Sequence, residues 1–185
     1  ADAPLFEVSS QDIRVCPEAC WVDSREFEAL LQVCEAHDHD GDQLCSACIE
    51  RLERAVALYK GAFLAGLNLR DGAAFDEWLL LLREDLQEKA AQALGALARS
   101  FAAVGDLERA LDYARRWAEL SPLEDAAHRQ VMVVLARLGR RLEALAHYTS
   151  YRKLLQDELG LGPEADTTAL YQRMLEASAG PIGWS

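Results

Sequence analysis

The side chains best suited to chemistry are gathered in one short segment. Cys34 and His37 form one pair, and Cys45 and Cys48 form a second pair after seven intervening residues. Zinc takes four tetrahedral nitrogen or sulfur ligands, and paired ligands let each half of a site come from one turn or helix end. The spacing predicts a closed, structural zinc site whose ligands are Cys34, His37, Cys45 and Cys48.

Other interpretations of this segment stay open. His39 could replace His37, although the two-residue spacer before His37 has the same length as the spacer in the second pair. Cys34 and Cys48 could instead be small apolar core residues beside exposed histidines. A disulfide is the remaining possibility.

The number and location of the cysteines favour reduced thiols. All five lie between Cys16 and Cys48. An odd number, in a chain long enough to fold without cross-links, fits free thiols or metal ligands better than a disulfide framework. Cys16 and Cys20 lie apart from the other three, in a stretch expected to be extended. We expect them to be free thiols in a reducing cytosol, outside the metal site.

Other chemical motifs are weak or missing in the sequence. The acidic run 38–42 fails as a calcium loop, because its glycine stands at the fourth position rather than the sixth and Ile49 replaces the bidentate glutamate. Only His128 and His147 lie outside the cysteine-rich segment, and the phosphate-loop and nucleophile-elbow motifs do not occur. We predict no catalytic residue, no cofactor besides zinc and no enzymatic activity.

Charge and composition narrow the class of protein. The 185 residues include 19 Lys or Arg and 31 Asp or Glu, for a net charge of −12. Such a chain would be repelled by duplex DNA, so it is not expected to bind DNA alone. A hydrophobic fraction of 51% predicts a folded core. No apolar run long enough for a membrane span occurs, so we expect a cytoplasmic protein without membrane contact.

Apolar spacing predicts mainly helices after a short hairpin. The apolar residues of Leu5 to Val15 flank a polar turn, which predicts two short strands. Ser121, followed by Pro122 and then Glu124, predicts a helix that begins at Pro122. Arg129 is expected to pair with Glu124 or Asp125. The other helices are expected to begin near Asp23, at Cys45 or Ser46, near Ala73 and at Asp166, the second running to about Leu64 and the third, with a bend, to Gly105.

An internal repeat gives the strongest indication of the fold. Matching residues recur at an interval of 34, the period of tetratricopeptide repeats. Their small residues let paired helices approach, and their large residues fill the groove between pairs. The pattern predicts an all-α, tetratricopeptide-like fold, a right-handed superhelix of helix pairs. The matching pairs are Gly105 and Gly139, Ala110 and Ala144, Leu111 and Leu145, Trp117 and Tyr151, and Leu120 and Leu154.

An ordered series of motifs resembles the bacterial transcriptional activator domain of AfsR-like regulators. The resemblance extends from about Asp23 to Glu176, and the combination is more specific than any single motif. The Cys34 to Cys48 segment is not among the family's defining features. The motifs are Glu77-Trp78-Leu79 with Arg83, Gly105-Asp106, Ala126 to Arg129 with Met132, Leu138-Gly139, Ala144-Leu145 with Tyr148, and Glu158 to Gly160 with Pro163 and Thr168.

The resemblance implies a division of the chain into three parts. Residues 1–22 would hold the hairpin that closes a winged-helix DNA-binding domain lying outside this chain. Residues 23–178 would form the helical-repeat activator domain, with the Cys/His loop at 34–48. Residues 179–185 would be a linker or disordered tail.

The resemblance also implies a function in transcription. The domain would relay signals through contacts with RNA polymerase, a neighbouring domain or a second protomer, and DNA would be bound only through the winged helix. The alternative from another class is a helical-repeat adaptor that binds peptides and has no part in transcription.

Overall fold

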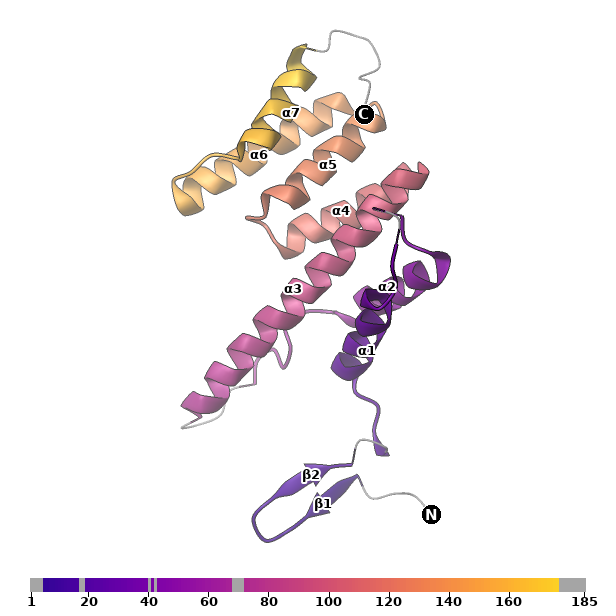
Figure 1. Ribbon diagram of the computed structural model, residues 1–185. Coiled ribbons are helices and arrows are strands. Elements are labelled where there is room, and N and C mark those ends of the chain that lie inside the picture. Colours follow the sequence, from indigo (N-terminus) through magenta and orange to yellow (C-terminus); the bar gives the residue numbers. More distant parts are fainter. Residues whose placement is uncertain (1–4, 17–18, 40, 42, 68–71, 177–185) are drawn as a thin grey trace.

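The computed structural model describes most of the chain, and within it seven helices follow one two-stranded antiparallel sheet (Figure 1). This confirms the predicted all-α helical repeat with an N-terminal hairpin. Along the described helices, none is long and apolar enough to cross a lipid bilayer. The expected tail at 179–185 lies outside the described residues, which are 5–16, 19–39, 41, 43–67 and 72–176.

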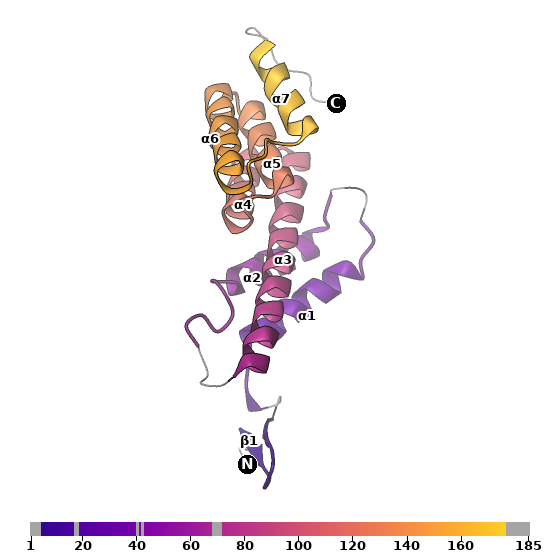
Figure 2. The ribbon, with the colours of Figure 1, turned by 90° about the vertical axis from the view of Figure 1, so that its left-hand side faces the viewer.

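The hairpin consists of β1 (Phe6–Val8) and β2 (Ile13–Val15), paired so that Phe6 lies opposite Val15. The hydroxyl of Ser9 accepts a hydrogen bond from the backbone N–H of Asp12 at 2.9 Å, which closes the turn. All six strand residues are exposed. The hairpin lies apart from the helices, beyond the start of α1 (Figures 1 and 2).

The first helix pair is α1 (Asp23–Glu35) and α2 (Ser46–Leu58). Its buried side chains recur at the spacing of one helix face. The predicted extension of α2 to Leu64 is wrong, because Tyr59 has a non-helical backbone and the guanidinium of Arg83 binds the carbonyl oxygens of Phe63 and Leu64, each at 2.7 Å. The buried residues are Phe27, Leu30, Leu31 and Cys34 on α1 and Cys48, Leu52, Ala55 and Val56 on α2.

The central element is α3 (Ala73–Val104), one helix of 32 residues without interruption. Its C-terminal part is buried between the α1–α2 pair and α4 (Leu107–Leu120), while its N-terminal end projects past them (Figure 2). Gly95 permits a close approach to α4, because a Cβ atom there would lie 3.1 Å from the ring of Trp117.

The repeat continues through α5 (Asp125–Arg137), α6 (Arg141–Leu159) and α7 (Ala165–Glu176). Gly105 and Gly139, at equivalent positions 34 residues apart, both adopt positive φ, at 85° and 76°. Each glycine ends a helix where a residue with a side chain would be strained. Trp117 and Tyr151 stand at equivalent positions of the repeat, and both are buried, as expected for large residues that fill the groove between helix pairs.

The start of α5 differs from the prediction. Ser121 still belongs to the end of α4, since its N–H donates to the Trp117 carbonyl at 2.9 Å. The backbone then turns, and α5 begins at Asp125 rather than at Pro122. The last helix likewise begins at Ala165, one residue before the expected start. The expected partner of Arg129 is confirmed, because its guanidinium lies 2.9 Å from the carboxylate of Asp125.

Candidate metal centre

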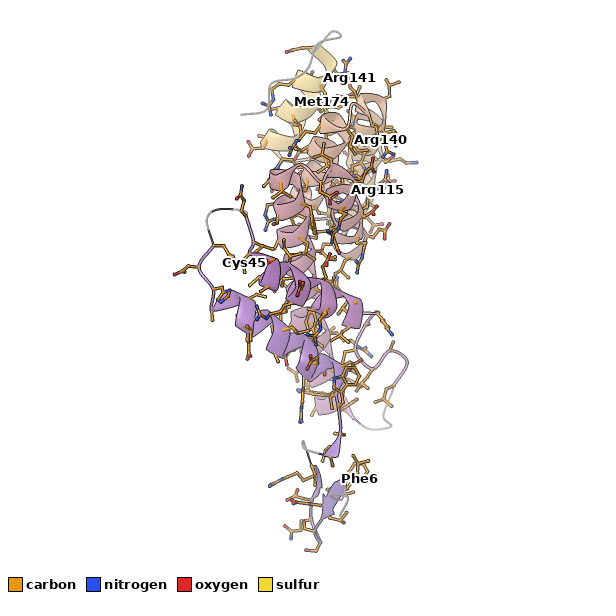
Figure 3. All side chains as sticks on the ribbon, turned by 90° about the vertical axis from the view of Figure 1, so that its right-hand side faces the viewer. Phe6, Cys45, Arg115, Arg140, Arg141 and Met174 are labelled. Carbon is orange, nitrogen blue, oxygen red and sulfur yellow. The ribbon has the colours of Figure 1, made fainter. Side chains whose placement is uncertain are left out.

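The candidate site lies in the loop that joins α1 to α2. Helix α1 ends at Glu35, so that His37 follows directly after its last turn. Cys45 is the N-cap residue of α2, with an extended backbone, and Cys48 lies in the first turn of that helix. Figure 3 shows Cys45 at the end of α2 that meets this loop. The end of one helix and the start of the next therefore bring the ligands together.

Four side chains converge there, namely His37, His39, Cys45 and Cys48. Their ligand atoms all lie within 4.8 Å of one another. The Nδ1 atom of His37 is 3.3 Å from the Cys48 sulfur and 3.7 Å from the Cys45 sulfur. Zinc–ligand bonds of about 2.0–2.3 Å place the corners of a tetrahedron about 3.3–3.8 Å apart. These two separations match the edges of such a site.

The ring of His39 gives independent support for a bound ion. Its Nε2 atom is buried and has no hydrogen-bond partner among the described residues. Buried polar atoms nearly always have a partner, so an unpaired one needs an explanation. A metal ion held by the four converging side chains would supply that partner. Two thiols and two imidazoles also suit zinc chemically.

The structure brings together three of the four predicted ligands and leaves Cys34 outside the group. Cys34 is buried on the core face of α1, and its thiol lies 3.7 Å from the carbonyl oxygen of Cys48. The fourth member is His39, which the spacing argument treated as a substitute for His37 rather than its companion. The sequence did hold a signal: Cys34 continues the helical spacing of Phe27, Leu30 and Leu31, which marks a core position.

The two cysteines of the group have opposite electrostatic environments. The pKa of Cys45 is lowered to about 6, because the His39 ring lies beside the thiol and the backbone N–H of Cys48 points toward it. Burial raises the pKa of Cys48 to about 12, and the neighbouring thiols of Cys45 and Cys34 add to this shift. The thiolate is the form that binds metal. As candidate ligands the two thiols therefore differ, because Cys45 loses its proton more readily than Cys48.

A hydrogen bond connects the loop between α1 and α2 to helix α3. The backbone N–H of Leu44 donates to the hydroxyl of the buried Ser100 on α3 at 3.2 Å. The guanidinium of Arg51 lies 4.0 Å from the Cys48 sulfur. The arrangement has four potential ligands for a tetrahedral ion, so it can hold a metal but offers it no free position for a substrate.

A second polar cluster lies between α5, α6 and α7, far from the loop. The Nδ1 atom of His128 is 3.0 Å from the Nε2 atom of His147, and the ring of His128 stacks on Tyr151. Burial lowers the pKa of His128 and lowers that of His147 to about 4. Both rings are therefore neutral at neutral pH. Nearby, the buried Asp125 accepts hydrogen bonds from Arg129 and Thr167.

Comparison with known proteins identifies the family to which the chain belongs. Residues 22–175 match the bacterial transcriptional activator domain. The chain is 32% identical over 166 residues to the regulatory protein AfsR of Streptomyces coelicolor, a match that covers 84% of this chain and 15% of that protein. It is 45% identical over 56 residues to AfsR of Streptomyces griseus, which covers 30% of this chain and 6% of the relative. The chain spans only a small part of these relatives and belongs to the bacterial transcriptional activator domain family.

Proposed function

We propose that this chain is the protein-interaction and signal-relay part of a bacterial transcriptional activator and acts in the cytoplasm. The observation that carries the proposal is the family match across residues 22–175. The net charge of −12 supports a role through protein contacts, because an acidic surface repels DNA. A winged-helix domain outside these residues would bind the DNA.

The exposed hairpin supports a domain boundary near residue 22. Phe6, Val8, Ile13 and Val15 are all exposed, and the strand register places the four of them on one face of the hairpin. An isolated two-stranded hairpin is marginally stable in water, so these apolar side chains need a partner surface. We propose that residues 1–22 close the winged-helix domain and that residues 23–178 are the activator domain.

The cluster of His37, His39, Cys45 and Cys48 supports a structural zinc ion. We propose that zinc fixes the polar loop between α1 and α2, which has little apolar surface of its own, and so sets the position of α2 against α3. Because four ligands would complete the coordination of zinc, the site supports a structural role rather than hydrolysis. We propose that the protein is not an enzyme.

Binding to bacterial RNA polymerase tests the proposed function. Immobilised chain is titrated with RNA polymerase holoenzyme and, separately, with a DNA duplex. We expect saturable binding of the polymerase and none of the duplex. Binding of neither, together with self-association in sedimentation analysis, would move the role to contacts between protomers. Saturable binding of unrelated extended peptides without polymerase binding would contradict the proposal and favour the adaptor.

A further inference from the structure

The two cysteines of the candidate metal centre are unequal in access to solvent. Cys45 is exposed at the N-cap of α2, and Cys48, three residues later in the first turn, is fully buried. The sulfur atoms of the two residues lie within 4.8 Å of each other. A Cys-x-x-Cys pair at a helix start is an arrangement in which one thiol can attack and the other can close a disulfide.

We propose that Cys45 and Cys48 are an oxidation site for hydroperoxides, and that disulfide formation between them expels the bound metal. This inference rests on the proposed zinc centre and adds a means of regulating it. Oxidation would remove two of the four ligands at once, and two imidazoles alone do not form a closed zinc site. The loop between α1 and α2 would then lose its cross-link.

The reaction balances with a hydroperoxide as the two-electron oxidant. The Cys45 thiolate attacks the terminal peroxide oxygen, an S–O bond forms, the O–O bond breaks and an alcohol, or water from hydrogen peroxide, leaves after taking a proton. The Cys48 thiolate then attacks the sulfenic sulfur, an S–S bond forms, and hydroxide leaves as water with a second proton. Two thiolates are oxidised, the peroxide is reduced, and the metal departs as the divalent ion.

The order of attack is set by burial and by the helix start. Cys45 is open to a small oxidant, whereas Cys48 is covered and reached only from within the cluster. Cys45 is also the N-cap residue of α2, three positions before Cys48 in the first turn, which places the two sulfur atoms close together. Cys34 is the competing partner, since its thiol neighbours the Cys48 thiol and lies 3.7 Å from the Cys48 carbonyl. It is buried on α1, however, so an oxidant in solvent reaches Cys45 first.

The test uses the zinc-loaded chain and hydrogen peroxide. Zinc release is monitored with a chromogenic chelator, and the disulfide is located by peptide mapping under non-reducing conditions. We expect one zinc ion released for each Cys45–Cys48 disulfide formed. We also expect dithiothreitol and added zinc to restore the metal content and the melting temperature, which irreversible damage would not allow. Zinc retention with intact thiols, or a disulfide from Cys34 to Cys48, would overturn the inference.

Cys34→Ser provides the matched control, because Cys34 lies beside the cluster but outside the ligand group. We expect this variant to release zinc on oxidation with the same stoichiometry as the unmodified chain. Loss of the response in this variant would assign the chemistry to Cys34 and contradict the inference. The zinc content before oxidation is a separate readout: a chain that binds no zinc refutes the proposed centre, whereas a zinc-loaded chain that resists peroxide refutes only the oxidation site.

Discussion

The loop between α1 and α2 and the turns between the repeat helices are closed by different means. In the repeat, Gly105 and Gly139 reverse the chain within a few residues, and backbone hydrogen bonds complete each turn, such as the one from Arg140 N–H to the Leu135 carbonyl at 2.8 Å. The α1–α2 connection is longer and polar, and it carries the Cys/His cluster. A short turn fixes its own geometry, whereas a long polar loop needs another interaction to hold it.

The energetic consequence is that apolar packing holds the repeat helices and the bodies of α1 and α2, whereas a metal would hold only the loop that joins α1 to α2. The interface between α3 and α4 is lined by fully buried residues such as Leu97, Leu111 and Ala114. Among the described residues of the loop beside the cluster, Leu44 is the residue that packs against this core, and its N–H donates to Ser100. The two regions should therefore respond differently to a core substitution and to a chelator.

Trp117→Ala is expected to have the largest effect. The ring is 5% exposed, it packs against Gly95, and its Nε1 donates to Glu124 at 2.8 Å. Truncating a buried tryptophan costs about 3–5 kcal/mol in the free energy of unfolding, measured by denaturant titration. Trp21→Ala, at a residue that is 67% exposed, is the control and should change stability by less than about 0.5 kcal/mol. Equal losses in both would contradict a core role for Trp117.

His37→Ala is expected to have the next largest effect, through loss of zinc. At a metal concentration about 100 times the dissociation constant, binding stabilises the folded state by about 2.7 kcal/mol, and this contribution would disappear. His39→Ala should act in the same way, since His39 belongs to the ligand group. Elemental analysis and thermal melting measure both effects. Cys34→Ser should keep its zinc; if it loses zinc while His39→Ala keeps it, the ligand set predicted from spacing is right.

The repeat around Trp117 and the candidate ligand group also show what the sequence predicts and what it does not. The period of 34 residues predicts the repeat because each position repeats one local packing environment, as Trp117 and Tyr151 illustrate. The spacing of His37, Cys45 and Cys48 predicts their convergence because each pair sits at a helix end. The helical spacing of Phe27, Leu30 and Leu31 marks Cys34 as a core residue, so the sequence could have excluded it. The inclusion of His39 depends on the path of the loop, which tertiary packing decides.

Asp125→Asn tests the contact between α5 and α7. The carboxylate is 7% exposed and accepts hydrogen bonds from Arg129 at 2.9 Å, from the Glu164 N–H at 3.0 Å and from the Thr167 hydroxyl. Removing its charge is expected to cost about 1.5–3 kcal/mol of unfolding free energy in urea titration. Asp112→Asn, on the exposed face of α4, is the matched control and should change little. No difference between the two would mean that packing alone joins these helices.

Acidification is expected to have the smallest effect. The folded-state pKa of His147 is about 4, below the ordinary 6.5, because the ring is desolvated by burial and His128 and Arg115 lie near it. The unfolded state therefore binds more protons between these values, and stability falls as the pH drops from about 6.5 toward 4. The ring is partly exposed, so we expect a loss on the order of 1 kcal/mol.

Replacement by glutamine isolates this contribution. His147→Gln removes the titrating group, so the difference in unfolding free energy between it and the unmodified chain should vary with pH only below about 6.5. Both proteins carry the same Cys/His cluster, and any acid-induced loss of metal cancels in the comparison. A difference that stays constant from about pH 7 to 4 would show that burial of His147 is not linked to protonation.

The most direct test of the central claim is amide hydrogen exchange of the chain with measured zinc content, before and after chelation. If zinc closes the α1–α2 connection while packing closes the repeat, the purified chain holds one zinc ion, and chelation speeds exchange in the loop and at the start of α2 by at least about tenfold. Exchange in α4 and α5 stays unchanged. A chain without zinc after reducing, chelator-free purification, or uniform acceleration across all helices, would contradict the account.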